Sequence, residues 1–166
     1  MHKSRLPKTM TRERLFAAAV RVVDAVGIDA LTIRSVALAA ELAPLSLYSY
    51  FVRKDQLLDL LAEGLGSALL EGMGGRGWPE DLAQLCQNIR GMLLESPRRL
   101  SLLSRWVAGF PRPELDSLLD AMVESGMTRQ AAWHTLRDAG SLALALATRE
   151  LSAQSRHRHD DARLSR

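Results

Sequence analysis

Apolar residues recur at the three- and four-residue spacing of an α-helix along most of the chain. Near the start, Leu15, Ala19 and Val22 fall on one side of a helix. That helix is expected to begin after Thr11, a residue type that caps helix N-termini, and to end at Gly27. No segment shows the alternation of apolar and polar residues that is typical of a half-buried strand. The sequence therefore predicts an all-α fold.

Helical spacing also predicts the later elements, and glycines and prolines mark the breaks between them. Four glycines and a proline lie between Gly72 and Pro79, so we place the joint between two domains nearby. Further helices are expected at about residues 33–40, 44–51, 55–69, 80–95, 98–109, 113–125 and 129–152, and Thr32 is the expected N-cap of the first of these. We expect a three-helix N-terminal domain, a C-terminal helical bundle and a polar, disordered tail, at residues 1–56, 57–155 and 156–166.

The chain has one cysteine, Cys86, which excludes a disulfide framework within the chain and is typical of a reducing compartment. No apolar run is long enough to cross a bilayer, and the N-terminus lacks the apolar core of a signal peptide. We therefore expect a cytoplasmic protein without a membrane partner.

Basic residues are concentrated in the first third of the chain. Residues 1–56 carry nine Lys or Arg and five Asp or Glu, which gives a net charge of +4. The remainder carries 13 Lys or Arg and 14 Asp or Glu, which gives a net charge of −1. A basic front on a near-neutral body suits contact with a polyanion. Charge alone leaves a solvated basic tail as an equal alternative.

Residues 32–54 predict two short helices joined by a tight turn, which is the arrangement of a DNA-binding helix-turn-helix. Apolar positions on the first helix can pack against Leu47 and Phe51 of the second and so hold the angle between the two. The other side of the second helix carries hydroxyl and phenol groups that can bond to phosphates and base edges. This segment is therefore the candidate DNA-binding site.

The same segment resembles the N-terminal domain of the TetR family of repressors. The similarity rests on residues 31–40 (LTIRSVALAA), 47–51 (LYSYF) and 54–58 (KDQLL), whose spacing matches the family pattern without a gap. It implies a homodimer that binds a double-stranded DNA operator, represses transcription and is released by a small-molecule inducer. No cofactor is implied.

The resemblance also implies DNA contacts for individual residues. Thr32 and Arg34 correspond to contacts from the first short helix, and Tyr48 and Lys54 correspond to phosphate contacts. The groove-facing positions of the second helix, called the recognition helix, are Pro44, Leu45, Ser46, Ser49 and Tyr50.

Three departures from the family pattern fall in this segment. Glu41 stands where the family has a turn glycine, and Ala43 replaces a Ser or Thr cap. Ser49 and Tyr50 replace an Arg-His pair, which changes the base preference. The first two predict a looser turn, and they support an alternative function, a small-molecule binding protein on the same scaffold that binds no operator.

The C-terminal part resembles the tetracycline-repressor-like branch of the family, through residues 78–82 (WPEDL), 96–98 (SPR), 113–115 (PEL) and the turn at 123–128. This resemblance implies a hydrophobic cavity for a small apolar or amphipathic inducer. Plain core packing is the commoner role for apolar residues at helical spacing. The candidates to line the cavity are Leu85, Ile89, Met92, Leu103, Trp106, Phe110, Met122 and Trp133.

Residues 139–147 are apolar almost all round the last predicted helix, which indicates burial on every side. We expect a second subunit to supply part of this cover in a two-fold dimer. The small residues expected at the contact are Ala139, Gly140, Ala143 and Ala147. The recognition helices of such a dimer would lie about 34–36 Å apart, one turn of DNA, on a near-palindromic operator.

Catalytic residues do not form a recognisable set in this sequence. Three of the four histidines, His2, His157 and His159, lie in the terminal segments, and there is one cysteine. Such a chain offers no nucleophile–base pair and no convincing metal site. We therefore expect neither enzymatic activity nor a bound metal.

Overall fold

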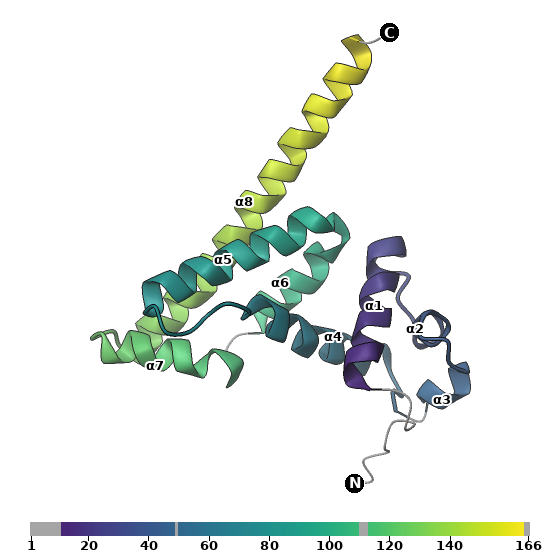
Figure 1. Ribbon diagram of the computed structural model, residues 1–166, viewed down its shortest axis with the longest axis horizontal. Coiled ribbons are helices and arrows are strands. Elements are labelled where there is room, and N and C mark those ends of the chain that lie inside the picture. The colour runs from purple at the N-terminus through teal and green to yellow at the C-terminus, as the bar shows by residue number, and fades with distance from the viewer. Residues whose placement is uncertain (1–10, 49, 110–112, 165–166) are drawn as a thin grey trace. The chain divides into compact units, whose positions relative to one another are not determined.

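The computed structural model describes residues 11–48, 50–109 and 113–164, and over these residues it consists of helices joined by loops, without a β-strand (Figure 1). The predicted all-α class is confirmed. The chain divides into two compact units, residues 1–67 and 68–166.

The N-terminal unit contains α1 (Arg12–Val26), α2 (Ile33–Ala39), α3 (Pro44–Tyr48) and most of α4 (Lys54–Leu69). α1 begins as the sequence predicts, because the Thr11 hydroxyl accepts a hydrogen bond from the Arg14 amide at 3.3 Å. The same hydroxyl and the residue's own amide lower the pKa of Glu13, which carries negative charge at the helix N-terminus. α1 ends at Gly27, whose φ of +84° lies in the region that favours glycine.

α1 and α4 approach closely at Gly64. A Cβ atom on Gly64 would overlap with Cδ2 of Phe16, so the Phe16 ring lies directly against the α4 backbone. At the adjacent position, Arg12 of α1 forms an ion pair with Glu63 of α4 at 2.5 Å. The mid-helix glycine therefore has a packing reason, which offsets its low helix propensity.

The unit boundary lies after Ser67, whereas we placed it after residue 56 from the sequence. The difference arises because α4 supplies part of the N-terminal core. Leu57 and Leu61 are fully buried, and Leu65 is nearly so. Burial of this leucine stripe makes the first turns of α4 part of the N-terminal unit.

The C-terminal unit contains α5 (Trp78–Glu95), α6 (Leu100–Ala108), α7 (Asp116–Glu124) and α8 (Arg129–Leu164). α8 packs against the other three helices. Short 3-10 turns precede α6 and α7, at Pro97–Arg99 and Pro113–Leu115. The fully buried core residues of this unit come from all four helices, and they include Leu85, Ile89, Leu93, Leu103, Trp106, Leu119, Met122, Leu136 and Ala147.

The glycine-rich segment after α4 is a loop, as predicted, and α5 holds it by hydrogen bonds. The Asn88 amide donates to the carbonyls of Leu69 and Glu71, at 2.8 and 3.0 Å. Gln84 bonds to Asn88 at 2.9 Å, and Arg76 donates to Gln84 at 3.3 Å. Polar side chains of α5 therefore satisfy the carbonyls at the end of α4 that have no helical partner.

α8 is longer than the sequence led us to expect. We predicted a helix to about residue 152 and a disordered tail from residue 156, but α8 continues to Leu164. That prediction was wrong because polarity was taken as a sign of disorder. No glycine or proline follows Gly140, and Ala153, Gln154 and Arg156 are good helix formers.

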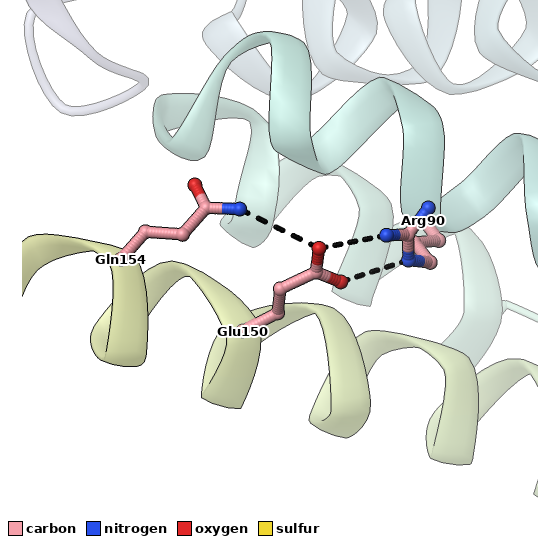
Figure 2. Close-up of polar contacts among 3 residues, drawn as sticks. All are labelled: Arg90, Glu150 and Gln154. Carbon is pink, nitrogen blue, oxygen red and sulfur yellow. Dashed lines mark hydrogen bonds and ion pairs between the residues drawn. The ribbon is translucent and has the colours of Figure 1, made fainter. Parts of the chain in front are cut away.

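An ion pair joins the middle of α8 to α5 (Figure 2). Two guanidinium nitrogens of Arg90 donate to the two carboxylate oxygens of Glu150, at 2.7 and 2.8 Å. The Gln154 amide donates to the same carboxylate at 3.4 Å. A bidentate pair constrains both distance and direction, so it adds a specific polar link to the packing of α8 on α5.

Candidate nucleic-acid interface

The start of α2 is closed by a reciprocal pair of side-chain caps. The Thr32 hydroxyl accepts from the Ser35 amide at 3.0 Å, and the Ser35 hydroxyl accepts from the Thr32 amide at 2.9 Å. This capping box satisfies two amides that have no partner within the helix. Thr32 is thus confirmed as the N-cap that the sequence predicted.

The turn between α2 and α3 is regular despite the absence of a glycine. Glu41 has a φ of +58°, the left-handed conformation that a turn glycine would adopt. The amide of Leu42 donates to the Ala37 carbonyl at 2.8 Å, and the amide of Glu41 donates to the Leu38 carbonyl at 3.0 Å. These two bonds form a Schellman motif, so the turn keeps its geometry, and the strain falls on Glu41.

Arg21 of α1 supports the same turn, a role that the sequence analysis missed. Its guanidinium donates to the carbonyl of Ala39, in the last turn of α2, at 2.7 Å. A cation near a helix C-terminus is favourable because the unpaired carbonyls gather there. The available signal was that α2 has no basic residue in its last turn, which leaves that place to a neighbouring helix.

α3 separates an inner from an outer side, as the helix-turn-helix interpretation requires. Leu47 is fully buried. Leu45 is 84% exposed and Tyr48 is 51% exposed, and their i, i+3 spacing places them on one face. The Ser46 amide donates to the Ala43 carbonyl at 2.9 Å, so backbone bonding begins α3 although Ala43 has no side-chain cap.

The other candidate DNA contacts fall into two groups. Thr32 and Arg34 are exposed. The half-buried candidates are Pro44, Ser46, Tyr50 and Lys54. Ser49 lies outside the described residues. The exposed side chains come from the start of α2 and from α3, which are the two places where a helix-turn-helix contacts DNA.

Side-chain bonds also define the start of α4. The Gln56 carbonyl oxygen accepts from the Val52 amide at 2.7 Å and from the Arg53 amide at 3.3 Å. The ammonium of Lys54 donates to the carbonyls of Ile28 and Asp29, at 2.8 and 3.2 Å. Both ends of the helix-turn-helix are therefore held by side chains from within the unit.

The apolar residues predicted to line a ligand cavity lie mostly in the C-terminal core. Met92 and Trp133 are half-buried, and Phe110 lies outside the described residues. The fully buried members are Leu85, Ile89, Leu103, Trp106 and Met122. A hollow of about 530 Å³ lies along α8, but it is lined by other residues, from Thr148 to Arg156.

The small residues of α8 face the chain's own core, not a second subunit. Ala147 is fully buried, and Ala143 is 8% exposed. A Cβ atom on Gly140 would lie 3.4 Å from both Val107 methyl groups of α6. Our assignment of Gly140, Ala143 and Ala147 to a subunit contact is therefore wrong, whereas Ala139 is half-buried. The exposed apolar residues of this stretch are Leu142 and Leu146, at 59% and 51%.

The part of the chain that the structure describes contains neither a cluster of metal-ligating side chains nor a helix that could span a membrane. Within residues 11–48, 50–109 and 113–164, no three His, Cys, Asp or Glu side chains are grouped to hold a metal ion. Within the same ranges, no helix combines the length and apolar character that a bilayer crossing requires.

Comparison with known protein families identifies the N-terminal unit. Residues 15–61 match the family described as bacterial regulatory proteins, tetR family. Over these residues the chain is similar to the TetR family. The match covers the buried stripe of α1, the helix-turn-helix and the first half of α4, all within the N-terminal unit.

The curated proteins that this chain resembles are regulators of transcription. An HTH-type transcriptional regulator of Saccharopolyspora erythraea is 29% identical over 103 residues, 61% of this chain and 44% of that protein. The HTH-type transcriptional repressor DrrR1 of Streptomyces coeruleorubidus is 33% identical over 97 residues, 57% of this chain and 36% of the relative. The chain spans less than half the length of either relative.

Solved structures extend the similarity of fold to nearly the whole chain. Mycobacterium smegmatis BioQ has a TM-score of 0.68 and 23% identity, covering 93% of this chain and 86% of BioQ. BioQ in complex with its double-stranded DNA operator has a TM-score of 0.65 and 22% identity, covering 94% of this chain and 95% of that BioQ chain. A TetR variant from Acinetobacter baumannii AYE, in complex with minocycline, has a TM-score of 0.67 and 21% identity, covering 93% of this chain and 89% of the variant.

Proposed function

We propose that this chain is a transcriptional repressor that binds the major groove of operator DNA through α3. The observation that carries the proposal is the division of α3 into a buried and an exposed side. Leu47 anchors the helix in the core, while Leu45 and Tyr48 extend into solvent on one face. A recognition helix needs this arrangement, because its packing must be rigid and its outer side chains must be free to contact bases.

The exposed residues offer both kinds of contact that DNA recognition needs. Arg34 and Thr32, at the start of α2, suit the phosphate backbone, where charged and hydroxyl side chains set the register of a protein on DNA. Leu45 suits a thymine methyl group in the groove. Tyr48 presents a phenol beside it. From the family resemblance we add Pro44, Ser46, Ser49 and Tyr50 to this surface.

The alternative, a ligand-binding protein without an operator, rested on Glu41 and Ala43. The turn at Glu41 closes through two backbone bonds, and the Ala43 carbonyl begins α3 through another. Neither departure opens the helix-turn-helix, so the structure favours the DNA-binding function over the alternative.

The repressor acts as a homodimer in this proposal, with Leu142 and Leu146 of α8 at the contact. These leucines are more than half exposed, and they lie one turn apart on the same side of α8. Two-fold pairing presents two copies of α3 to one duplex, which calls for a palindromic operator with half-sites about 10 base pairs apart.

A small apolar or amphipathic inducer bound in the C-terminal unit releases the operator. Support comes from the apolar core of this unit and from a neighbour of the same fold that was solved with minocycline. Release requires that the inducer bind the DNA-free state more tightly than the DNA-bound state.

Selection of duplexes from a random-sequence library by the wild-type chain tests the function. We expect a palindrome to be enriched, and Leu45→Ala to lower affinity for it by about 1–3 kcal/mol, the usual effect of one lost base contact. Val26→Ala is the matched control, because Val26 is 57% exposed on α1, outside the proposed surface. The repressor proposal fails if no sequence is enriched even at low salt, where phosphate contacts are strongest.

A further inference from the structure

Lys54 occupies an unusual position for a residue expected to contact a phosphate. It is the first residue of α4, half-buried, and its ammonium donates to the Ile28 and Asp29 carbonyls at 2.8 and 3.2 Å. These carbonyls belong to the loop that leaves α1 and leads to α2. The Lys54 side chain therefore points back into its own unit.

The surroundings of the ammonium explain why it is held there. The last turn of α1 has the sequence VDAV and contains no basic residue. The negative end of the α1 dipole faces the loop that follows it, so a cation is stabilised at the Ile28 and Asp29 carbonyls. By contrast, a lysine at the N-terminus of α4 is disfavoured by the dipole of its own helix, and the carbonyl bonds offset this cost.

Lys54 and the two carbonyls that it contacts lie on opposite sides of the helix-turn-helix in the sequence. The Ile28 carbonyl also accepts from the Leu31 amide at 3.2 Å, and Leu31 is fully buried immediately before the Thr32 cap. Lys54 directly follows the segment that leaves α3. Its ammonium thus closes the segment from Thr32 to Arg53 into a loop whose entry and exit are tied together.

We propose that Lys54 is a positioning residue, which sets the orientation of α3 by tying the entry of the helix-turn-helix to its exit and does not act as a phosphate contact. The inference rests on the proposed DNA-binding function. Loss of these bonds would remove no DNA-contacting side chain. It would, however, broaden the range of orientations that α3 adopts. Recognition of one sequence would suffer more than attraction to any duplex.

The test compares Lys54→Met with Arg53→Met. Both substitutions remove one positive charge, but Arg53 is exposed, and its side chain is not bonded to the Ile28 or Asp29 carbonyl. The probes are the duplex that the wild-type chain selects from a random library and a scrambled duplex of equal length and composition. Dissociation constants are measured for both at several salt concentrations.

We expect Lys54→Met to weaken binding to the selected duplex by about tenfold, the factor that one hydrogen bond to a charged group contributes. Its affinity for the scrambled duplex and its salt dependence should match the wild type. Arg53→Met should change both duplexes by one common factor. The proposal is overturned if Lys54→Met weakens both duplexes equally and flattens the salt slope by about 0.9, the signature of one lost phosphate contact. It is also overturned if Lys54→Met binds as the wild type does.

Two further measurements still test the proposal if Lys54→Met does not fold or if the wild-type chain selects no duplex. In the wild-type chain, the ¹⁵N signal of the Lys54 ammonium, assigned by its loss in Lys54→Arg, should keep its position when the selected duplex is added. A new coupling of this signal to ³¹P would contradict the proposal. Without DNA, amide exchange at Leu31 should be faster in Lys54→Met than in Arg53→Met. If the wild-type chain selects no duplex, the repressor function fails, and the exchange result still decides whether Lys54 ties the two ends.

Discussion

The two units differ in how their backbone ends and apolar surfaces are completed. In the N-terminal unit, side chains close each end of the helix-turn-helix: Thr32 at the start of α2, Arg21 at its end, and Lys54 across the whole segment. In the C-terminal unit, α8 has small residues against the core and leaves Leu142 and Leu146 exposed. The bonds that close the helix-turn-helix all come from within the first unit, whereas Leu142 and Leu146 form an apolar surface that a partner can cover.

The two units also differ in how much space surrounds a helical glycine. A Cβ atom on Gly64 of α4 would overlap with the Phe16 ring, but a Cβ atom on Gly140 of α8 would lie 3.4 Å from Val107. The N-terminal contact therefore admits no extra methyl group, while the C-terminal contact nearly does.

The largest expected effect comes from charging the open surface of α8. Leu146→Glu should raise the dissociation constant of the dimer at least a hundredfold, because an unpaired buried carboxylate costs about 3–5 kcal/mol. Sedimentation velocity measures this change, with Gln130→Glu as a control for added charge at an exposed position of the same helix. A dimer of unchanged strength in Leu146→Glu would show that this leucine face is not the contact.

The next largest effects are expected from two glycine substitutions, which should change the free energy of unfolding differently. Gly64→Ala should lower the free energy of unfolding by about 1–3 kcal/mol, because the Phe16 ring must move. Gly140→Ala should leave it unchanged or raise it by up to about 1 kcal/mol, since alanine is the better helix former. Denaturant unfolding measures both. Adding Phe16→Leu to Gly64→Ala should recover part of the loss, and equal effects of the two glycine variants would remove the contrast between the units.

The smallest expected effect tests the strain in the α2–α3 turn. Glu41→Gly should raise the free energy of unfolding by about 0.5–1 kcal/mol, because the left-handed conformation costs glycine little. Glu41→Ala removes the same charge but keeps the strain, so it should give no such gain. Both variants should bind the selected duplex more tightly at low salt, through the loss of an acid near phosphates. A stability gain in Glu41→Ala as large as that in Glu41→Gly would assign the effect to charge.

Local sequence signals predicted the helix-turn-helix well. Thr11 and Thr32 are N-caps as expected, Gly27 ends α1, and Leu47 is the buried anchor of α3. The effect of Glu41 was misjudged, because the sequence indicates that a glycine is absent but not that the backbone will adopt the left-handed conformation without one. The end of α8 was misjudged for a related reason, since a polar segment without glycine or proline can stay helical.

By itself, the sequence determined which segments are helical, where most of them start and stop, and which family motif the first of them form. Caps, breaks and apolar periodicity act within one or two turns, so they are visible without a fold. Only the tertiary structure decided which side of α8 the small residues cover, why Gly64 is a glycine, and where the Lys54 ammonium is bonded. These depend on contacts between residues far apart in the chain, and helical periodicity identifies a buried face without naming the surface that buries it.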